Sequence, residues 1–245
     1  LRKLRRENGF DEVNIEDITE SLAIFGIWGP KSREILQSLT DADLSNSQFP
    51  FMYSKEISIA GIKLRATRIT YVGELGWELY IPKESALNIW EMLHAAGGFP
   101  CGYRAIESLR LEKGYLAWAG EINTEYNPYE AGLGFAISKK KQNFYGAKSL
   151  ENLRNPSRKL VAITFQDIKQ VPLGSEPIRY GDKVIGRIKS GGQGYTINKA
   201  IAYAYLPIEF TNAGTELEVE FFGNWHKGVI ETTPLYDPTG AKIKA

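Results

Sequence analysis

The sequence has very little cysteine and histidine. One cysteine and two histidines occur among 245 residues, so a disulfide within the chain is excluded, and a zinc site built from the usual cysteine and histidine ligands is not expected. We therefore predict that the protein binds no metal. The near absence of cysteine fits a reducing compartment, and we predict a cytoplasmic location, or the mitochondrial matrix if the source is eukaryotic.

The sequence also lacks an excess of charge of either sign and long apolar runs. It contains 30 basic and 29 acidic residues, so electrostatics gives no reason to bind nucleic acid or an anionic membrane. No apolar run approaches the roughly 18 residues that a membrane-spanning helix needs. We predict a soluble protein with no nucleic-acid or membrane partner. Its length allows one large domain or two.

One stretch, from Tyr71 to Pro82, combines acids and glycines with an apolar and aromatic run. It is Tyr-Val-Gly-Glu-Leu-Gly-Trp-Glu-Leu-Tyr-Ile-Pro. Four of the residues at 68–72 are β-branched or aromatic, which predicts a strand there, and residues 77–81 predict a second strand that ends at the proline. Because Gly73 and Gly76 bracket the connection, we predict a hairpin.

Glu78 and Tyr80 are the candidate ligand-binding residues of this hairpin. Side chains alternate along a strand, so both point away from the core if the apolar residues between and beside them point into it. A half-buried carboxylate needs hydrogen-bond donors, and the planar N–H/NH2 edge of a pterin or guanine ring supplies two, while tyrosine rings cover its flat face. The alternative is a structural glutamate that accepts from a backbone amide or a distant arginine.

The first part of the chain mixes helices and strands. We predict that Glu107 and Arg110 pair across one turn of a helix, at positions i and i+3. Apolar periodicity and turn residues predict strands at 22–28, 57–59 and 62–70, and helices at 31–39, 84–96, 105–113 and 144–153.

From Arg158 onward the pattern changes to six short strands separated by glycine, proline and asparagine. This pattern predicts a small β-barrel or sandwich, with a boundary at Asn155-Pro156-Ser157 and domains at 1–157 and 158–245. The glycines between 191 and 194 are attributed to a hairpin, because no helix follows as a dinucleotide loop requires. We place His226 in a loop. The predicted fold class is α+β.

Two motifs then suggest a family. Tyr-x-Gly-Glu-x-Gly-x-Glu-x-Tyr at 71–80, together with Ser-Leu-Arg-Leu-Glu-Lys-Gly at 108–114, resembles the folate site of the aminomethyltransferase (glycine-cleavage T-protein) family. The sequence is most similar to the folate-binding C-terminal half of dimethylglycine and sarcosine dehydrogenases, and the resemblance covers nearly the whole chain. It implies part of a ring of three subdomains with a C-terminal barrel, tetrahydrofolate as cofactor, and a role in one-carbon metabolism.

The resemblance also implies site residues. Glu78 would hold the pterin, with Tyr71, Tyr80 and Trp118 as aromatic contacts; core packing is an equal alternative for Trp118. Arg104 lies near the position of a folate-holding arginine of the family, but Ile106 occupies that position itself. The catalytic residues stay unassigned, because the family's key aspartate lies in an N-terminal segment that has no counterpart here. We therefore expect this chain alone not to form methylene-tetrahydrofolate.

The implied partners depend on the branch of the family. A T-protein takes an aminomethyl group from a lipoyl carrier protein, whereas the dehydrogenases form an imine at a flavin domain. The flavin fingerprint is absent from these residues, so FAD would belong to a separate or missing domain. The alternative is a non-catalytic regulatory subunit similar to that of pyruvate dehydrogenase phosphatase. The methyl donor stays open among glycine, sarcosine and dimethylglycine.

Overall fold

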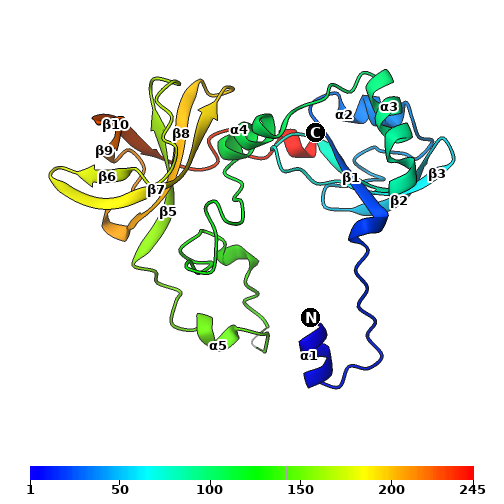
Figure 1. The fold of residues 1–245 in the computed structure, drawn as a ribbon, viewed down its shortest axis with the longest axis horizontal. Helices are drawn as coiled ribbons and strands as arrows, with labels where there is room; N and C mark the ends of the chain where they lie inside the picture. Colours follow the sequence, from blue (N-terminus) through cyan, green and yellow to red (C-terminus); the bar gives the residue numbers. More distant parts are fainter. Residues whose placement is uncertain (142) are drawn as a thin grey trace. The chain divides into compact units, whose positions relative to one another are not determined.

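The computed structural model describes residues 1–141 and 143–245. These residues form two compact units with separate hydrophobic cores. Figure 1 shows the order of their helices and strands along the chain. The first unit comprises residues 1–70, 74–100 and 242–245, and the second comprises residues 71–73 and 101–241.

The first unit is built on a four-stranded antiparallel sheet in the order β1-β4-β3-β2. Helices α2 (Ser32–Gln37) and α3 (Ala86–Ala95) cover one face of this sheet (Figure 1), and their apolar residues share its core. Helix α1 (Arg2–Glu7) buries none of its residues. The strands are β1 (Leu22–Trp28), β2 (Ser54–Ile59), β3 (Ile62–Thr67) and β4 (Gly76–Pro82).

Strand β4 has the alternation that its sequence predicts. Trp77, Leu79 and Ile81 are 0% exposed, whereas Glu78 and Tyr80 lie on the opposite face and are half-buried. A one-residue slip in register would turn the three apolar side chains out of the core. Burial of one face therefore determines which way Glu78 points.

The predicted strand at residues 68–72 is wrong. Strand β3 ends at Thr67, and the loop that follows leads to β4. Arg68 is 1% exposed, and its guanidinium donates to Asn46 Oδ1 at 2.6 Å and to the Phe49 carbonyl at 2.8 Å. These tertiary contacts of the arginine outweigh the β-propensity of its neighbours.

The second unit contains a closed six-stranded barrel in the order β10-β5-β8-β7-β6-β9. Neighbouring strands are antiparallel, and all six strands were expected from the sequence. Alternate residues of these strands fill the interior. The strands are β5 (Arg158–Phe165), β6 (Pro177–Tyr180), β7 (Lys183–Gly194), β8 (Lys199–Pro207), β9 (Glu216–Phe221) and β10 (Asn224–Glu231).

Two α-helices of the second unit lie outside the barrel. Helix α4 (Tyr103–Lys113) lies against β7, and α5 (Ala147–Leu150) is a single turn. Within the described residues, no helix is both long and apolar enough to cross a bilayer. Turns of 3-10 helix lie at Thr19–Ser21, Lys83–Ser85, Gly134–Ala136, Ile208–Phe210 and Lys242–Lys244.

Two expectations about the barrel are corrected. Gly191 and Gly192 lie within β7 and not in a hairpin turn. A Cβ at Gly191 would lie 2.3 Å from the Pro172 carbonyl oxygen, and one at Gly192 would lie 2.5 Å from Leu111 Cδ1, so close packing explains both glycines. His226 lies on β10 and stacks on Phe221 at 3.9 Å, so it is not a loop residue.

The division into domains at 1–157 and 158–245 stays a prediction, which limited trypsin digestion tests. Arg154 is exposed and precedes the Asn155-Pro156-Ser157 segment, so we expect the first cut after Arg154. The variant Arg154→Gln removes that cleavage site and should lose this product without a change in the free energy of unfolding. First cuts that all fall elsewhere, identified by mass spectrometry, would contradict the boundary.

Candidate functional site

The candidate site begins with the carboxylate of Glu78. The Tyr80 hydroxyl, two residues along β4, donates a hydrogen bond to Glu78 Oε2 at 2.9 Å, and this bond raises the pKa of Tyr80. In the described part of the chain no lysine, arginine or histidine forms an ion pair with Glu78. An ionised carboxylate accepts about four hydrogen bonds, so Glu78 retains capacity for donors of a ligand.

The strands on either side of β4 shape the surroundings of Glu78. Gly26 of β1 and Thr67 of β3 are its register partners, and neither places a long side chain beside the carboxylate. Trp28, two residues after Gly26, lies on the same face of the sheet and is half-buried. Trp28 is not among the residues that the sequence predicts for the site. No local sequence pattern indicates it, because only the pairing of β1 with β4 brings Trp28 beside Glu78.

Tyr71 lies in the second unit and contacts the loop that follows α4. Its hydroxyl donates to the Leu116 carbonyl at 3.1 Å, and its ring stacks on Tyr115 with centroids 6.2 Å apart. Burial raises the pKa of Tyr71. The structure thus brings Tyr71 to the loop that carries Trp118.

Trp118 and Arg104 are exposed residues of the second unit. The Trp118 side chain is 68% exposed, so it is not a core residue of this unit, and Arg104 is exposed in the first turn of α4. Glu78 and Tyr80 belong to the first unit. The structure therefore brings Glu78 together with Tyr80, and the ligand contacts of Tyr71, Trp118 and Arg104 stay predictions.

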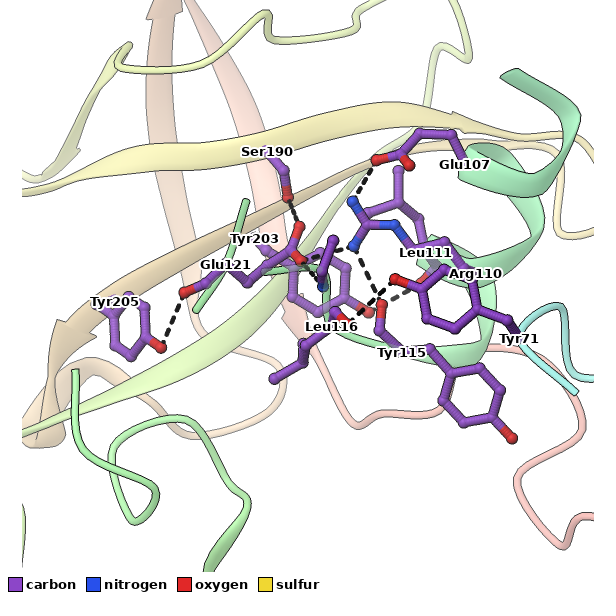
Figure 2. A network of polar contacts seen from close by, with 11 residues as sticks. Tyr71, Glu107, Arg110, Leu111, Tyr115, Leu116, Glu121, Ser190, Tyr203 and Tyr205 are labelled. Atoms are coloured by element: carbon purple, nitrogen blue, oxygen red, sulfur yellow. Dashed lines mark hydrogen bonds and ion pairs between the residues drawn. The ribbon is translucent and has the colours of Figure 1, made fainter. Parts of the chain in front are cut away.

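A buried ionic network, centred on Arg110, holds the loop after α4 (Figure 2). Arg110 is 1% exposed. The predicted pair with Glu107 is confirmed, and Nη1 also donates to Glu121 Oε2 at 2.7 Å and to the Tyr115 carbonyl at 3.1 Å. Burial by itself lowers the pKa of Arg110, but the hydrogen bonds to Glu107 and Glu121 outweigh burial and raise it.

Glu121 is a central residue of this network that the sequence does not predict. It is 0% exposed, and its carboxylate also accepts hydrogen bonds from the Ala117 amide at 2.8 Å and from the Ser190 hydroxyl. Arg110 and Glu121 thus tie both ends of the 115–121 loop to α4 and to β7. Because the pair joins α4, the 115–121 loop and β7, we interpret the network as structural.

Two buried tyrosines beside this network predict a loss of stability at high pH. Tyr203 donates to the Leu111 carbonyl at 2.9 Å and Tyr205 to the Glu121 carbonyl at 3.0 Å, and burial raises the pKa of both above the ordinary value near 10. Above that value the unfolded chain releases two protons that the folded chain keeps. Their contribution to stability is therefore complete below about pH 10 and falls by about 1.4 kcal/mol per pH unit for each tyrosine.

Urea unfolding at several pH values between about pH 9 and pH 11 tests this prediction for the two tyrosines, because it measures the free energy of unfolding at each pH. The double variant Tyr203→Phe, Tyr205→Phe keeps both rings and removes the titrating hydroxyls, so between about pH 9 and pH 11 it should lose about 2.7 kcal/mol less stability than the parent. Equal slopes in the parent and the double variant would contradict the prediction.

Glu130 is a further buried acid with contacts inside the protein. Its carboxylate accepts hydrogen bonds from Arg158 Nε at 2.8 Å and from the Asn127 amide at 2.9 Å.

Among the described residues, no group of three or more histidine, cysteine, aspartate or glutamate side chains is placed to hold a metal ion.

Comparison with known proteins agrees with this fold and these motifs. Residues 1–141 match the family model of the GCVT N-terminal domain, and residues 158–237 match that of the glycine cleavage T-protein C-terminal barrel domain. The class is thus an α+β fold with a C-terminal barrel. The chain belongs to the aminomethyltransferase, or glycine cleavage T-protein, family.

The similarity to individual relatives extends over most of this chain. It is 38% identical to the mitochondrial dimethylglycine dehydrogenase of Rattus norvegicus, over 96% of this chain and 28% of that protein. It is 35% identical to an aminomethyltransferase of Symbiobacterium thermophilum, over 96% of this chain and 65% of that protein. The chain therefore spans less than two thirds of the length of either relative.

A solved structure shares the fold. The crystal structure of the glycine cleavage system aminomethyltransferase T from Bartonella henselae matches with a TM-score of 0.79 and 28% sequence identity. The match covers 89% of this chain and 60% of that one.

Proposed function

We propose that this chain binds tetrahydrofolate and holds it for the capture of a one-carbon unit. The observation that carries the proposal is the position of Glu78. Its carboxylate points away from the core of the first unit, accepts one hydrogen bond from Tyr80, and forms no ion pair with a described cation. Membership of the aminomethyltransferase family supports the choice of folate as the ligand.

The chemistry of the carboxylate fits the edge of a pterin ring. A pterin presents an N–H and an NH2 group in one plane, and a carboxylate accepts both through parallel charge-assisted hydrogen bonds. The Tyr80 hydroxyl fixes the carboxylate by donating to one of its oxygens, which leaves the remaining lone pairs for the ligand. Bound tetrahydrofolate would supply the nitrogen atoms that take up the one-carbon unit.

The source of the one-carbon unit is part of the proposal. An aminomethyl group on a lipoyl carrier and an imine formed at the flavin domain of a dimethylglycine or sarcosine dehydrogenase are both compatible with the relatives. In the second case FAD belongs to a different domain. The printed names of the dehydrogenase relatives include "mitochondrial", and we propose a cytoplasmic or mitochondrial-matrix location. None of the relatives named here is a regulatory subunit of a phosphatase.

Calorimetric titration with folinic acid, a stable reduced folate, tests the proposal. We expect saturable binding by the folded 245-residue chain, with competition by tetrahydrofolate. Biotin, which carries a carboxylate and a fused ring system but no pterin edge, serves as the control ligand and should not bind. A folded chain that does not bind folinic acid at millimolar concentration would overturn the proposal.

A further inference from the structure

The indole ring of Trp28 lies over two glycines beside Glu78. In the pairing of β1 with β4, Gly26 is the partner of Glu78, and Trp28 is the partner of Gly76. Directly opposite residues of an antiparallel pair point to the same face, so all four residues share one face of the sheet. The ring covers the backbone at the position next to the carboxylate.

Only glycine is compatible with this placement of the ring. A Cβ at Gly26 would lie 2.1, 2.3 and 2.5 Å from three carbons of the Trp28 six-membered ring. A Cβ at Gly76 would lie 2.1 Å from the Ile27 carbonyl oxygen and 2.5 Å from Trp28 Cδ1. Three such similar distances show that the face of the ring, not its edge, covers Gly26. Gly26 is therefore needed for the indole to lie flat on the sheet, and Gly76 admits both the indole and the neighbouring backbone of β1.

A hydrogen bond fixes the orientation of the ring. Trp28 Nε1 donates to the Ile69 carbonyl at 3.0 Å, so the polar atom of the indole is satisfied within the protein. The side chain nevertheless stays half-buried, and Gly26 beneath it is exposed. The sheet thus presents a fixed aromatic surface with a carboxylate at its side.

We propose that Trp28 is the surface on which the flat heteroaromatic ring of the ligand stacks while Glu78 binds the edge of that ring. The inference rests on the proposed folate function and assigns it a second specificity residue. A carboxylate reads N–H donors in the plane of the ring, and an indole recognises the π-face. Together they favour binding of a flat ring with an amino edge over binding of aliphatic amines or of rings that lack such an edge.

The first test compares Trp28→Leu with Trp28→Phe. Trp28→Leu removes the stacking contact with the ligand ring, so we expect it to lower the affinity for folinic acid about tenfold or more. Trp28→Phe keeps a flat ring and should stay within about threefold of the parent. Trp90→Leu is the matched control, because Trp90 lies on α3 and contacts Phe25 on the covered face of the sheet. Its affinity should not change.

A second test leaves Trp28 in the sequence. Gly26→Ala forces the ring off the sheet and should lower the affinity in the same direction as Trp28→Leu, and a melting curve verifies that the variant is folded. Folinic acid should also quench tryptophan fluorescence. Trp28→Phe should still bind folinic acid but should lose part of this quenching. Trp90→Leu should keep the part of the quenching that comes from Trp28. This readout decides the matter even if Trp28→Leu does not fold.

The outcomes separate the two proposals. If the parent binds folinic acid but folded Trp28→Leu or Gly26→Ala keeps its affinity, or Trp28→Phe keeps its full quenching, the role of Trp28 is overturned and the folate function stands. If the folded parent does not bind folinic acid, the folate function is overturned and the role of Trp28 with it.

Discussion

Replacement of Glu78 by Gln is expected to lower the affinity for folinic acid about tenfold to a hundredfold. The amide keeps the shape of the carboxylate but turns one acceptor into a donor, which would face a donor of the pterin edge. Hydrogen bonds to a charged group contribute roughly 1.5–3 kcal/mol each, and about 1.4 kcal/mol corresponds to a factor of ten in affinity. Calorimetric titration measures the change.

A matched control for this variant lies on the same sheet. Glu56 of β2 is exposed and pairs with Lys63 at 3.7 Å, and Glu56→Gln should leave the affinity unchanged. If Glu78 is only a structural residue, Glu78→Gln lowers the melting temperature while the folded protein binds folinic acid as the parent does. That combination would contradict the prediction.

Arg110→Met is expected to lower the free energy of unfolding by about 3–5 kcal/mol. The substitution leaves Glu121, which is 0% exposed, as a buried carboxylate without its cation, and removal of one partner of a buried ion pair has an effect of this size. It also removes the hydrogen bond to the Tyr115 carbonyl. Urea unfolding of the parent and the variant measures the difference.

Two further variants identify the cause. Arg104→Met, in the first turn of the same helix, removes an exposed arginine and should change the stability by less than about 0.5 kcal/mol. Adding Glu121→Gln to Arg110→Met replaces the unpaired charge with a neutral amide and should recover at least about 1 kcal/mol. Arg110→Met with a stability equal to that of Arg104→Met would show that the network does not stabilise the fold.

Several features of the site could be predicted from the sequence because they depend on local patterns. The alternation in β4 places Glu78 and Tyr80 on the face opposite Trp77 and Leu79, since only this arrangement buries the apolar side chains. The pair of Glu107 and Arg110 follows from the geometry of one helical turn. The barrel strands were recognisable because turn residues separate short runs of β-branched and aromatic residues.

Other features depend on residues that are distant in the sequence. Residues 68–72 have the composition of a strand, but β3 ends at Thr67. The guanidinium of Arg68 donates hydrogen bonds to Asn46 and to the Phe49 carbonyl. Glu121 reaches Ser190, 69 positions away, on β7. No local pattern records such partners, because they are set by which segments pack together.

By itself, therefore, the sequence determined the family, the α+β class, the barrel strands and the direction in which Glu78 points, because burial of one face imposes a period on neighbouring residues. The tertiary structure alone decided what lies beside Glu78. Trp28 reaches its place through the pairing of β1 with β4 and through a hydrogen bond to Ile69, 41 residues away. The physical reason is steric. The indole can lie flat on the sheet only where the strands beneath it carry glycine, and the register of β1 and β4 is what places both glycines under the same side chain.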